Sequence, residues 1–283
     1  MAISRRSMLR GAAGAALAVG AAGALPGVAA AEGATGHWGL RVPKDKISIQ
    51  LYTLRSILET DLEGTLDALA DIGYRKVELA GTYGRTAEEL AKILRRYRLS
   101  STSAHVGIDG DLNKVVADAK ALRNTYVVVP YVNLPTIAEW VSFTERLDAA
   151  SKVLRKAGLR LGYHNHAHEF QVLEGKRPYD VITKGTSSRD VHLEVDLYWA
   201  VTGGVDPVDV FRRNFPRVRQ YHVKDRKPDG GFADLGKGTI DFRRIFRETW
   251  HHHVDEYIVE NDEPVDALVT AEVGYKYLRD LRF

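Results

Sequence analysis

The chain has 283 residues, with 40 Lys and Arg against 37 Asp and Glu, and it contains no cysteine. The lack of cysteine excludes disulfides, thiol catalysis and cysteine-based zinc sites, and the near balance of charge offers no basic stripe of the kind that binds nucleic acid.

The first 31 residues are typical of an export signal. Two adjacent arginines in MAISRRSMLR precede an Ala- and Gly-rich apolar run over residues 11–25, and the small residues Ala29 and Ala31 suit cleavage. The run is too short to span a bilayer, and the arginine pair indicates the twin-arginine route. We therefore expect a signal peptide at 1–31, an N-terminal extension at 32–46, and a periplasmic or extracellular mature chain without a membrane span. That mature chain has 37 basic and 37 acidic residues, because the signal holds three Arg and no acid.

From Ile47 onward, short β-branched runs alternate with longer segments of helical periodicity, which predicts a parallel sheet. The expected strands are 47–52, 76–79, 101–106, 126–129, 160–164, 191–196, 218–223 and 257–260. Eight strand-helix pairs favour a single-domain (β/α)8 TIM barrel over 47–283, since a closed barrel leaves no exposed edge strand. An open doubly wound sheet is the alternative. The open sheet would be supported by a nucleotide-binding motif, GxGxxG or GxxxxGK[ST], but neither motif occurs in the sequence.

Two helices are clear from their apolar spacing. Leu62, Leu66, Leu69 and Ile72 mark the first, and a similar series at 143, 147, 150 and 154 marks the fourth. Gly73 and Gly158 follow these helices, at positions where a helix end favours a left-handed residue.

Ionisable side chains gather at the predicted strand ends. In such a barrel the carboxyl ends of the strands form one mouth, where function is found. The groups are Glu78, His105, His164, His166, Glu169, Asp196, His222, Lys224 and Glu260. Taken singly, an Asp there could cap a helix and a His could be a hydrogen-bonded core residue. Together, Glu169, Asp196, His222 and Glu260 predict a site for one divalent ion, Mn²⁺, Mg²⁺ or Co²⁺ in preference to Zn²⁺.

Several motifs from Ile47 to the C-terminus resemble one known family. They are IQLYTLR, GYHNHAHEF, LEVDLYWAVTGGVDP, YHVKD, DLGKGTIDF and VENDEP. Through them the chain resembles the sugar phosphate isomerase/epimerase-like proteins, which are xylose isomerase-like TIM barrels. The resemblance implies a barrel with a single divalent ion held by Glu169, Asp196, His222 and Glu260, the same four residues that the strand ends propose.

A related branch, the endonuclease IV type, has a similar fold but holds three zinc ions and cuts DNA. That branch needs a His three residues after the sixth-strand Asp, where this chain has Trp199. Its Asp-x-His before a glycine-rich turn is replaced by residues 232–235, FADL. We therefore expect a small-molecule sugar and not nucleic acid as the partner.

The predicted reaction is sugar isomerisation or epimerisation through an enediolate. A divalent ion stabilises the charge that develops on oxygen when the proton beside a carbonyl is removed. Glu169 and Glu260 are the predicted catalytic carboxylates that remove and return the proton, in addition to their predicted role as ligands. The predicted substrate-binding residues are His105, His166, Lys224 and Trp199.

Two alternatives remain open. The same enolate could eliminate a leaving group, which would make the protein a lyase or hydrolase of 3-keto-glycosides; the HNHxxEF form at strand five raises this alternative. Export favours a non-phosphorylated sugar or keto-sugar, because phosphorylated sugars are chiefly cytoplasmic. The other alternative is a non-catalytic exported sugar-binding protein. The sequence leaves a homo-oligomer open.

Overall fold

A computed structural model describes residues 39–250 and 254–283, so the predicted signal peptide and most of the predicted N-terminal extension lie outside the described residues. Eight parallel strands close into a barrel in the order β1, β10, β7, β6, β5, β4, β3, β2. They are β1 (Ile47–Gln50), β2 (Lys76–Leu79), β3 (Ser100–His105), β4 (Tyr126–Val129), β5 (Arg160–His164), β6 (Val191–Asp196), β7 (Val218–Val223) and β10 (Glu256–Val259). The predicted TIM barrel is confirmed.

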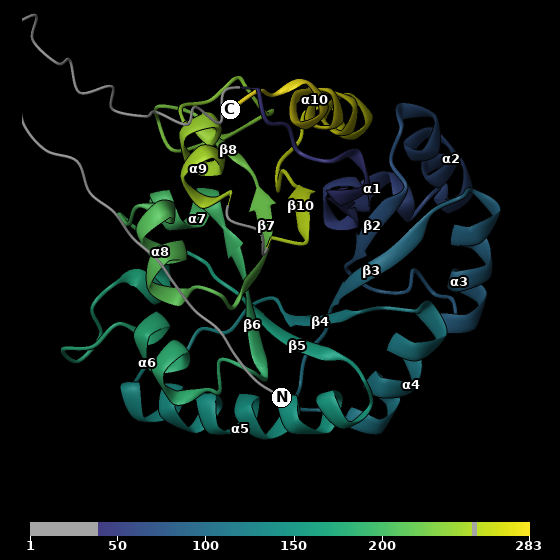
Figure 1. Cartoon of the computed structure of the whole chain (residues 1–283). Coiled ribbons are helices and arrows are strands. Elements are labelled where there is room, and N and C mark those ends of the chain that lie inside the picture. Colours follow the sequence, from purple (N-terminus) through teal and green to yellow (C-terminus); the bar gives the residue numbers. More distant parts are fainter. Residues whose placement is uncertain (1–38, 251–253) are drawn as a thin grey trace, which may run out of the picture. The chain divides into compact units, whose positions relative to one another are not determined.

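Helices surround the strands on the outside of the barrel (Figure 1). They are α1 (Arg55–Leu58), α2 (Leu62–Ile72), α3 (Ala87–Arg96), α4 (Leu112–Leu122), α5 (Ile137–Lys156), α6 (Pro178–Gly185), α7 (Leu197–Thr202), α8 (Pro207–Asn214), α9 (Phe242–Thr249) and α10 (Ala267–Asp280). Short 3₁₀ turns lie at Lys44–Lys46, Leu51–Leu54 and His168–Phe170, and β8 (Asp225–Arg226) pairs with β9 (Phe232–Ala233) in a small hairpin. Within the described part of the chain, none of these helices combines the length and the apolar character needed to cross a membrane.

The helix ends follow from local sequence. The Asp61 side chain accepts from the backbone N–H of Gly64 at the start of α2, and Thr86 and Glu89 form a reciprocal capping box at the start of α3. At the other end of α2, Gly73 has a φ of 127°, as its predicted role requires. These caps fix the residue at which each helix begins, and so the residue at which the preceding loop ends.

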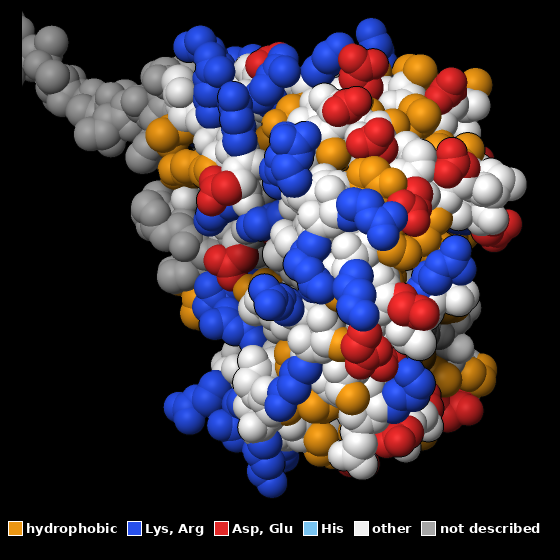
Figure 2. All heavy atoms as spheres, turned by 90° about the vertical axis from the view of Figure 1, so that its right-hand side faces the viewer, with side chains coloured by type: hydrophobic (Ala, Val, Ile, Leu, Met, Phe, Trp, Pro, Cys, Tyr) orange, Lys and Arg blue, Asp and Glu red, His pale blue; other side chains and the backbone are white. Residues whose placement is uncertain are grey.

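The apolar core lies between the strands and the helices. Leu66 and Leu69 of α2 and Phe143, Leu147 and Leu154 of α5 are at most 1% exposed. The outer surface is mixed: over the face formed by α2, α3 and α4, Lys and Arg side chains are interspersed with acidic and apolar ones (Figure 2). The packed layer makes the barrel a rigid frame for the groups that point inward.

The inside of the barrel is polar even at its amino-terminal end. Thr102 Oγ1 donates to Glu256 Oε1 at 2.6 Å, and Gln220 connects Glu256 to His192 through contacts of 3.3 and 3.0 Å. Burial raises the pKa of Glu256 to about 7 and lowers the pKa of His192 to about 4, so this layer disfavours charge on either side chain. The charged groups of the barrel gather instead at its carboxyl end.

Candidate functional site

The residues of the candidate site lie at or near the carboxyl ends of five strands. His105 ends β3, His164 ends β5, Asp196 ends β6, and Glu260 directly follows β10. His222 lies one residue before the end of β7. All five are buried or nearly so. Together with Glu194 of β6 they form two overlapping groups, and within each group the ligand atoms lie within 4.8 Å of one another. One group is His164, Asp196, His222 and Glu260, and the other is His105, His164, Glu194 and His222.

The first group is linked through Glu260. Its Oε2 lies 2.7 Å from His222 Nδ1 and 2.9 Å from Lys224 Nζ. The Lys224 ammonium also lies 3.2 Å from Asp196 Oδ2 and 2.9 Å from Asp262 Oδ1, although this lysine is only 1% exposed. One fixed positive charge therefore faces three carboxylates at the mouth.

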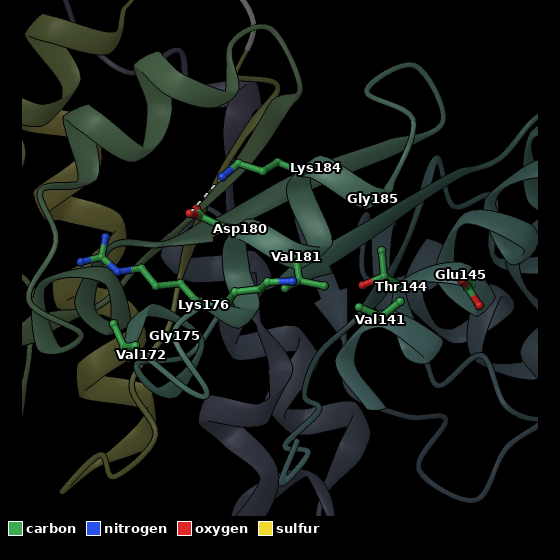
Figure 3. Close-up of a pocket in the computed structure, with 11 residues that line it drawn as sticks. Val141, Thr144, Glu145, Val172, Gly175, Lys176, Asp180, Val181, Lys184 and Gly185 are labelled. Atoms are coloured by element: carbon green, nitrogen blue, oxygen red, sulfur yellow. Dashed lines mark hydrogen bonds and ion pairs between the residues drawn. The ribbon is translucent and has the colours of Figure 1, made fainter. Parts of the chain in front are cut away.

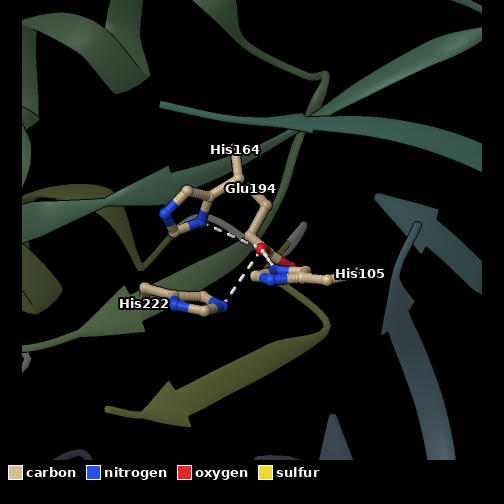
Figure 4. Close-up of side chains that lie close together, drawn as sticks. All are labelled: His105, His164, Glu194 and His222. Atoms are coloured by element: carbon tan, nitrogen blue, oxygen red, sulfur yellow. Dashed lines mark hydrogen bonds and ion pairs between the residues drawn. The ribbon is translucent and has the colours of Figure 1, made fainter. Parts of the chain in front are cut away.

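The second group converges on one oxygen (Figure 4). Glu194 Oε1 lies 2.8 Å from His105 Nε2, 3.1 Å from His164 Nδ1 and 3.0 Å from His222 Nε2. A further carboxylate, Glu78, lies 2.7 Å from His222 Nε2. Burial opposes charge on His105, but Glu78 and Glu194 prevail and raise its pKa to about 10, whereas burial and the neighbouring imidazoles hold the pKa of His164 well below its usual range.

The chemistry of these groups suits a metal ion. Asp196 accepts the backbone N–H of Trp199 through Oδ1, so one of its oxygens does cap α7. Its other oxygen, Oδ2, is buried and accepts no hydrogen bond, although the Lys224 ammonium lies 3.2 Å away, and Glu194 Oε2 is likewise buried without a hydrogen bond. Burial raises the pKa of Asp196 to about 6 even though Lys224 opposes the shift. Crowded buried carboxylates with spare lone pairs are the arrangement that a shared cation stabilises.

Glu169 lies apart from both groups. It sits in the 3₁₀ turn after β5, where its carboxylate accepts from Tyr163 Oη and from the backbone N–H of His166, each at 2.8 Å. These hydrogen bonds hold the Glu169 carboxylate beside Tyr163, and His164 lies with Asp196, His222 and Glu260 instead. The assignment of Glu169 as a ligand and as a base stays a prediction, and the described geometry offers His164 for the ligand role.

A cavity of about 420 Å³ opens above these groups. Its walls include the predicted substrate-binding residues His105, His166 and Lys224, together with His164 and Glu260. The fourth predicted residue, Trp199, packs beside His166 with a ring separation of 5.2 Å and is not among the lining residues. His166 Nδ1 is buried without a hydrogen-bond partner, and burial lowers the pKa of this imidazole to about 3.

A larger cavity of about 760 Å³ lies elsewhere, between α5 and α6 on the outside of the barrel (Figure 3). Its only marked polar contact in that view is the Asp180–Lys184 pair of α6, at 3.3 Å. Because none of the clustered imidazoles or carboxylates lines it, chemistry is assigned to the smaller cavity at the barrel mouth.

Sequence reasoning missed two members of the site. Glu78 was placed near the end of its strand but given no role, and Asp262 was not singled out at all. Both reach the site through contacts between strands that are far apart in the sequence, 144 residues apart for Glu78 and His222. For Glu194 a signal did exist, because strand alternation puts it on the same face as Asp196.

Comparisons with known proteins agree with this fold. The family model described as "Xylose isomerase-like TIM barrel" matches residues 66–259. Two curated relatives are inosose dehydratases. That of Geobacillus kaustophilus is 24% identical over 249 residues, covering 72% of this chain and 80% of that protein. That of Bacillus licheniformis is 25% identical over 178 residues, covering 55% of this chain and 58% of that protein.

Solved structures with the same fold include two sugar phosphate isomerase/epimerases from Parabacteroides distasonis. One has a TM-score of 0.75 at 23% identity and covers 90% of this chain and 98% of its own. The other has a TM-score of 0.73 at 26% identity and covers 83% of this chain and 98% of its own.

Proposed function

The chain belongs to the xylose isomerase-like TIM barrel family, and on that premise we propose that it is an enzyme that removes a proton beside the carbonyl of a non-phosphorylated sugar or keto-sugar. The observation that carries the proposal is the buried group of His164, Asp196, His222 and Glu260, which opens onto a cavity at the barrel mouth. A binding protein has no need for so many buried ionisable groups around one point.

These four residues would hold one divalent ion. Two imidazoles and two carboxylates suit Mn²⁺ or Co²⁺, and they also accept Mg²⁺ or Zn²⁺. When bound, the ion supplies a Lewis acid for the negative charge that develops on the substrate oxygen.

The protein's own groups divide the remaining work. Glu260 is the group that takes the proton, because it alone of the two predicted carboxylates lines the cavity. Lys224 and His222 hold the pKa of Glu260 well below its usual range against the effect of burial, which keeps the carboxylate ionised. The Lys224 ammonium, 2.9 Å from Glu260, lies where it can also stabilise an oxyanion. His105 and His166 face the cavity and can hold sugar hydroxyls.

The enolate formed by proton removal can react in two ways. Return of the proton to the carbon gives an isomer or epimer, as the names of the Parabacteroides distasonis proteins suggest for those chains. Loss of a group from the next carbon gives an elimination, with water or an alcohol as the leaving group. The inosose dehydratases support elimination, and that of Geobacillus kaustophilus aligns with 72% of this chain, which makes elimination the outcome we favour.

The proposal includes export of the mature chain. The paired arginines in MAISRRSMLR and the apolar run that follows support a twin-arginine signal. An exported enzyme meets free or glycosidic sugars, which is why a phosphate group is left out of the substrate.

The test is turnover in D₂O. The chain, loaded with Mn²⁺ or Co²⁺, is incubated with an inosose, a 3-keto-glucoside and D-fructose, and the products are analysed by mass spectrometry and, after chelation, by NMR. Elimination is expected to give an unsaturated product lighter by the mass of the leaving group. A product of unchanged composition with deuterium beside the carbonyl would mean isomerisation instead. Binding with neither product would contradict the proposed enzyme and support the sugar-binding alternative.

A further inference from the structure

A second hollow borders the cavity at the barrel mouth. This groove, about 570 Å³, runs between the segment after β1 and the loop after β2, and it shares Tyr52 and Ala80 with the mouth cavity. Arg55, Glu59 and Arg85 also line it. We call it the β1–β2 groove. Because the two hollows share two lining residues, they lie side by side.

The guanidinium of Arg55 is held in place without a carboxylate partner. It donates to the carbonyl oxygens of Tyr52 and Asp262, at 2.9 and 2.7 Å, and lies over the Tyr52 ring with 4.1 Å to the ring centroid. Across the described residues no ion pair is found for Arg55 or for Arg85, although the charge of Arg85 contributes to the lowered pKa of Glu63 and of Glu89. A guanidinium that is positioned by backbone carbonyls keeps its charge available to an anion.

The loop beside Arg85 has an unusual conformation. Tyr83 adopts a φ of 54°, which a bulky side chain rarely does, and its hydroxyl is buried without a hydrogen-bond partner. Strained residues persist where the surroundings hold them, and they cluster at binding sites.

The groove carries a net positive charge. Arg55 and Arg85 line it against Glu59, whereas the mouth mixes Glu260 and Asp262 with Lys224. An acidic substituent is attracted in the groove. The groove therefore suits a ligand that has a sugar at the mouth and an acid beyond it.

From these observations we infer that the β1–β2 groove binds a second unit of the substrate, joined to the reacting sugar and bearing a carboxylate. The inference rests on the proposed function for the sugar at the mouth and adds the class of substrate: an acidic glycoside, such as a uronic acid linked to a second sugar.

The test compares the binding of cellobiose with that of its glucuronic acid analogue to the full chain by isothermal titration calorimetry. The acidic disaccharide is expected to bind about threefold to tenfold more tightly than the neutral one, as one or two partly exposed ion pairs give. Arg85→Gln should remove most of this advantage and Glu59→Gln should enlarge it. The control, Arg95→Gln, changes an exposed arginine that lies outside the groove.

Equal affinity for the two disaccharides, or an advantage that survives in Arg85→Gln, would overturn the inference. Because this experiment measures binding without turnover, its result is independent of the D₂O test. A preference for the acid in a chain that converts no keto-sugar would leave the groove assigned and the proposed reaction wrong.

Discussion

Glu260→Gln is expected to lower turnover by a factor of about 10² to 10⁴, the range that removal of a general base produces. The amide keeps the size and most of the contacts of the carboxylate, but it cannot accept the proton. The side chain is 6% exposed and lies 2.7 Å from His222, so no water replaces its function directly. The measurement is kcat at saturating substrate and saturating divalent ion, which separates loss of the base from weaker binding of the ion.

Glu263→Gln is the matched control. Glu263 is exposed and lies three residues further along the same loop, and it is absent from the lining of the mouth cavity. Its variant should turn over within about twofold of the unmodified chain, as surface substitutions do. If Glu260→Gln kept a comparable rate, Glu260 would not be the base.

The second large effect is on stability. Lys224→Met is expected to destabilise the metal-free chain by about 3–5 kcal/mol, the usual cost of leaving buried charges without their partner. Lys224 is 1% exposed, and its ammonium lies within 3.2 Å of carboxylate oxygens of Asp196, Glu260 and Asp262. Methionine fills the same space but leaves the three acids to repel one another. Urea unfolding in the presence of EDTA measures the loss.

The control for this variant is Lys227→Met, which changes an exposed lysine in the turn between β8 and β9. Its stability should stay within about 0.5 kcal/mol of the unmodified chain. A divalent ion should restore part of the stability of Lys224→Met, because an ion that binds only the folded state stabilises it. A loss below 1 kcal/mol in EDTA would contradict the buried ion-pair network.

The barrel could be predicted because its strands carry their own signal. Strands β2, β4, β5, β6 and β7 begin and end at the predicted residues, since each is a short apolar or alternating run between helix signals. The hairpin of β8 and β9 was not predicted. Its two-residue strands are held by Asp225, which accepts from the backbone N–H groups of Gly236 and Gly238, and such a contact has no sequence period.

The site could be predicted only in part. Asp196, His222 and Glu260 come together because strand ends converge in any barrel, and this follows from the order of the strands alone. The position of Glu169 depends instead on how the chain turns after β5. There the Tyr163 hydroxyl donates a hydrogen bond to the Glu169 carboxylate. A single residue spacing cannot decide whether His164 or Glu169 faces the mouth.

Metal content tests the central claim most directly. The purified chain, exposed to divalent ions and then desalted, is analysed by mass spectrometry beside Asp196→Ala, His164→Ala and Glu169→Gln. We predict about one equivalent of Mn²⁺, Mg²⁺, Co²⁺ or Zn²⁺ per chain, lost in Asp196→Ala and His164→Ala and kept in Glu169→Gln. Retention in His164→Ala with loss in Glu169→Gln would restore Glu169 as the ligand. No bound ion in the unmodified chain after this exposure would contradict a metal-dependent enzyme.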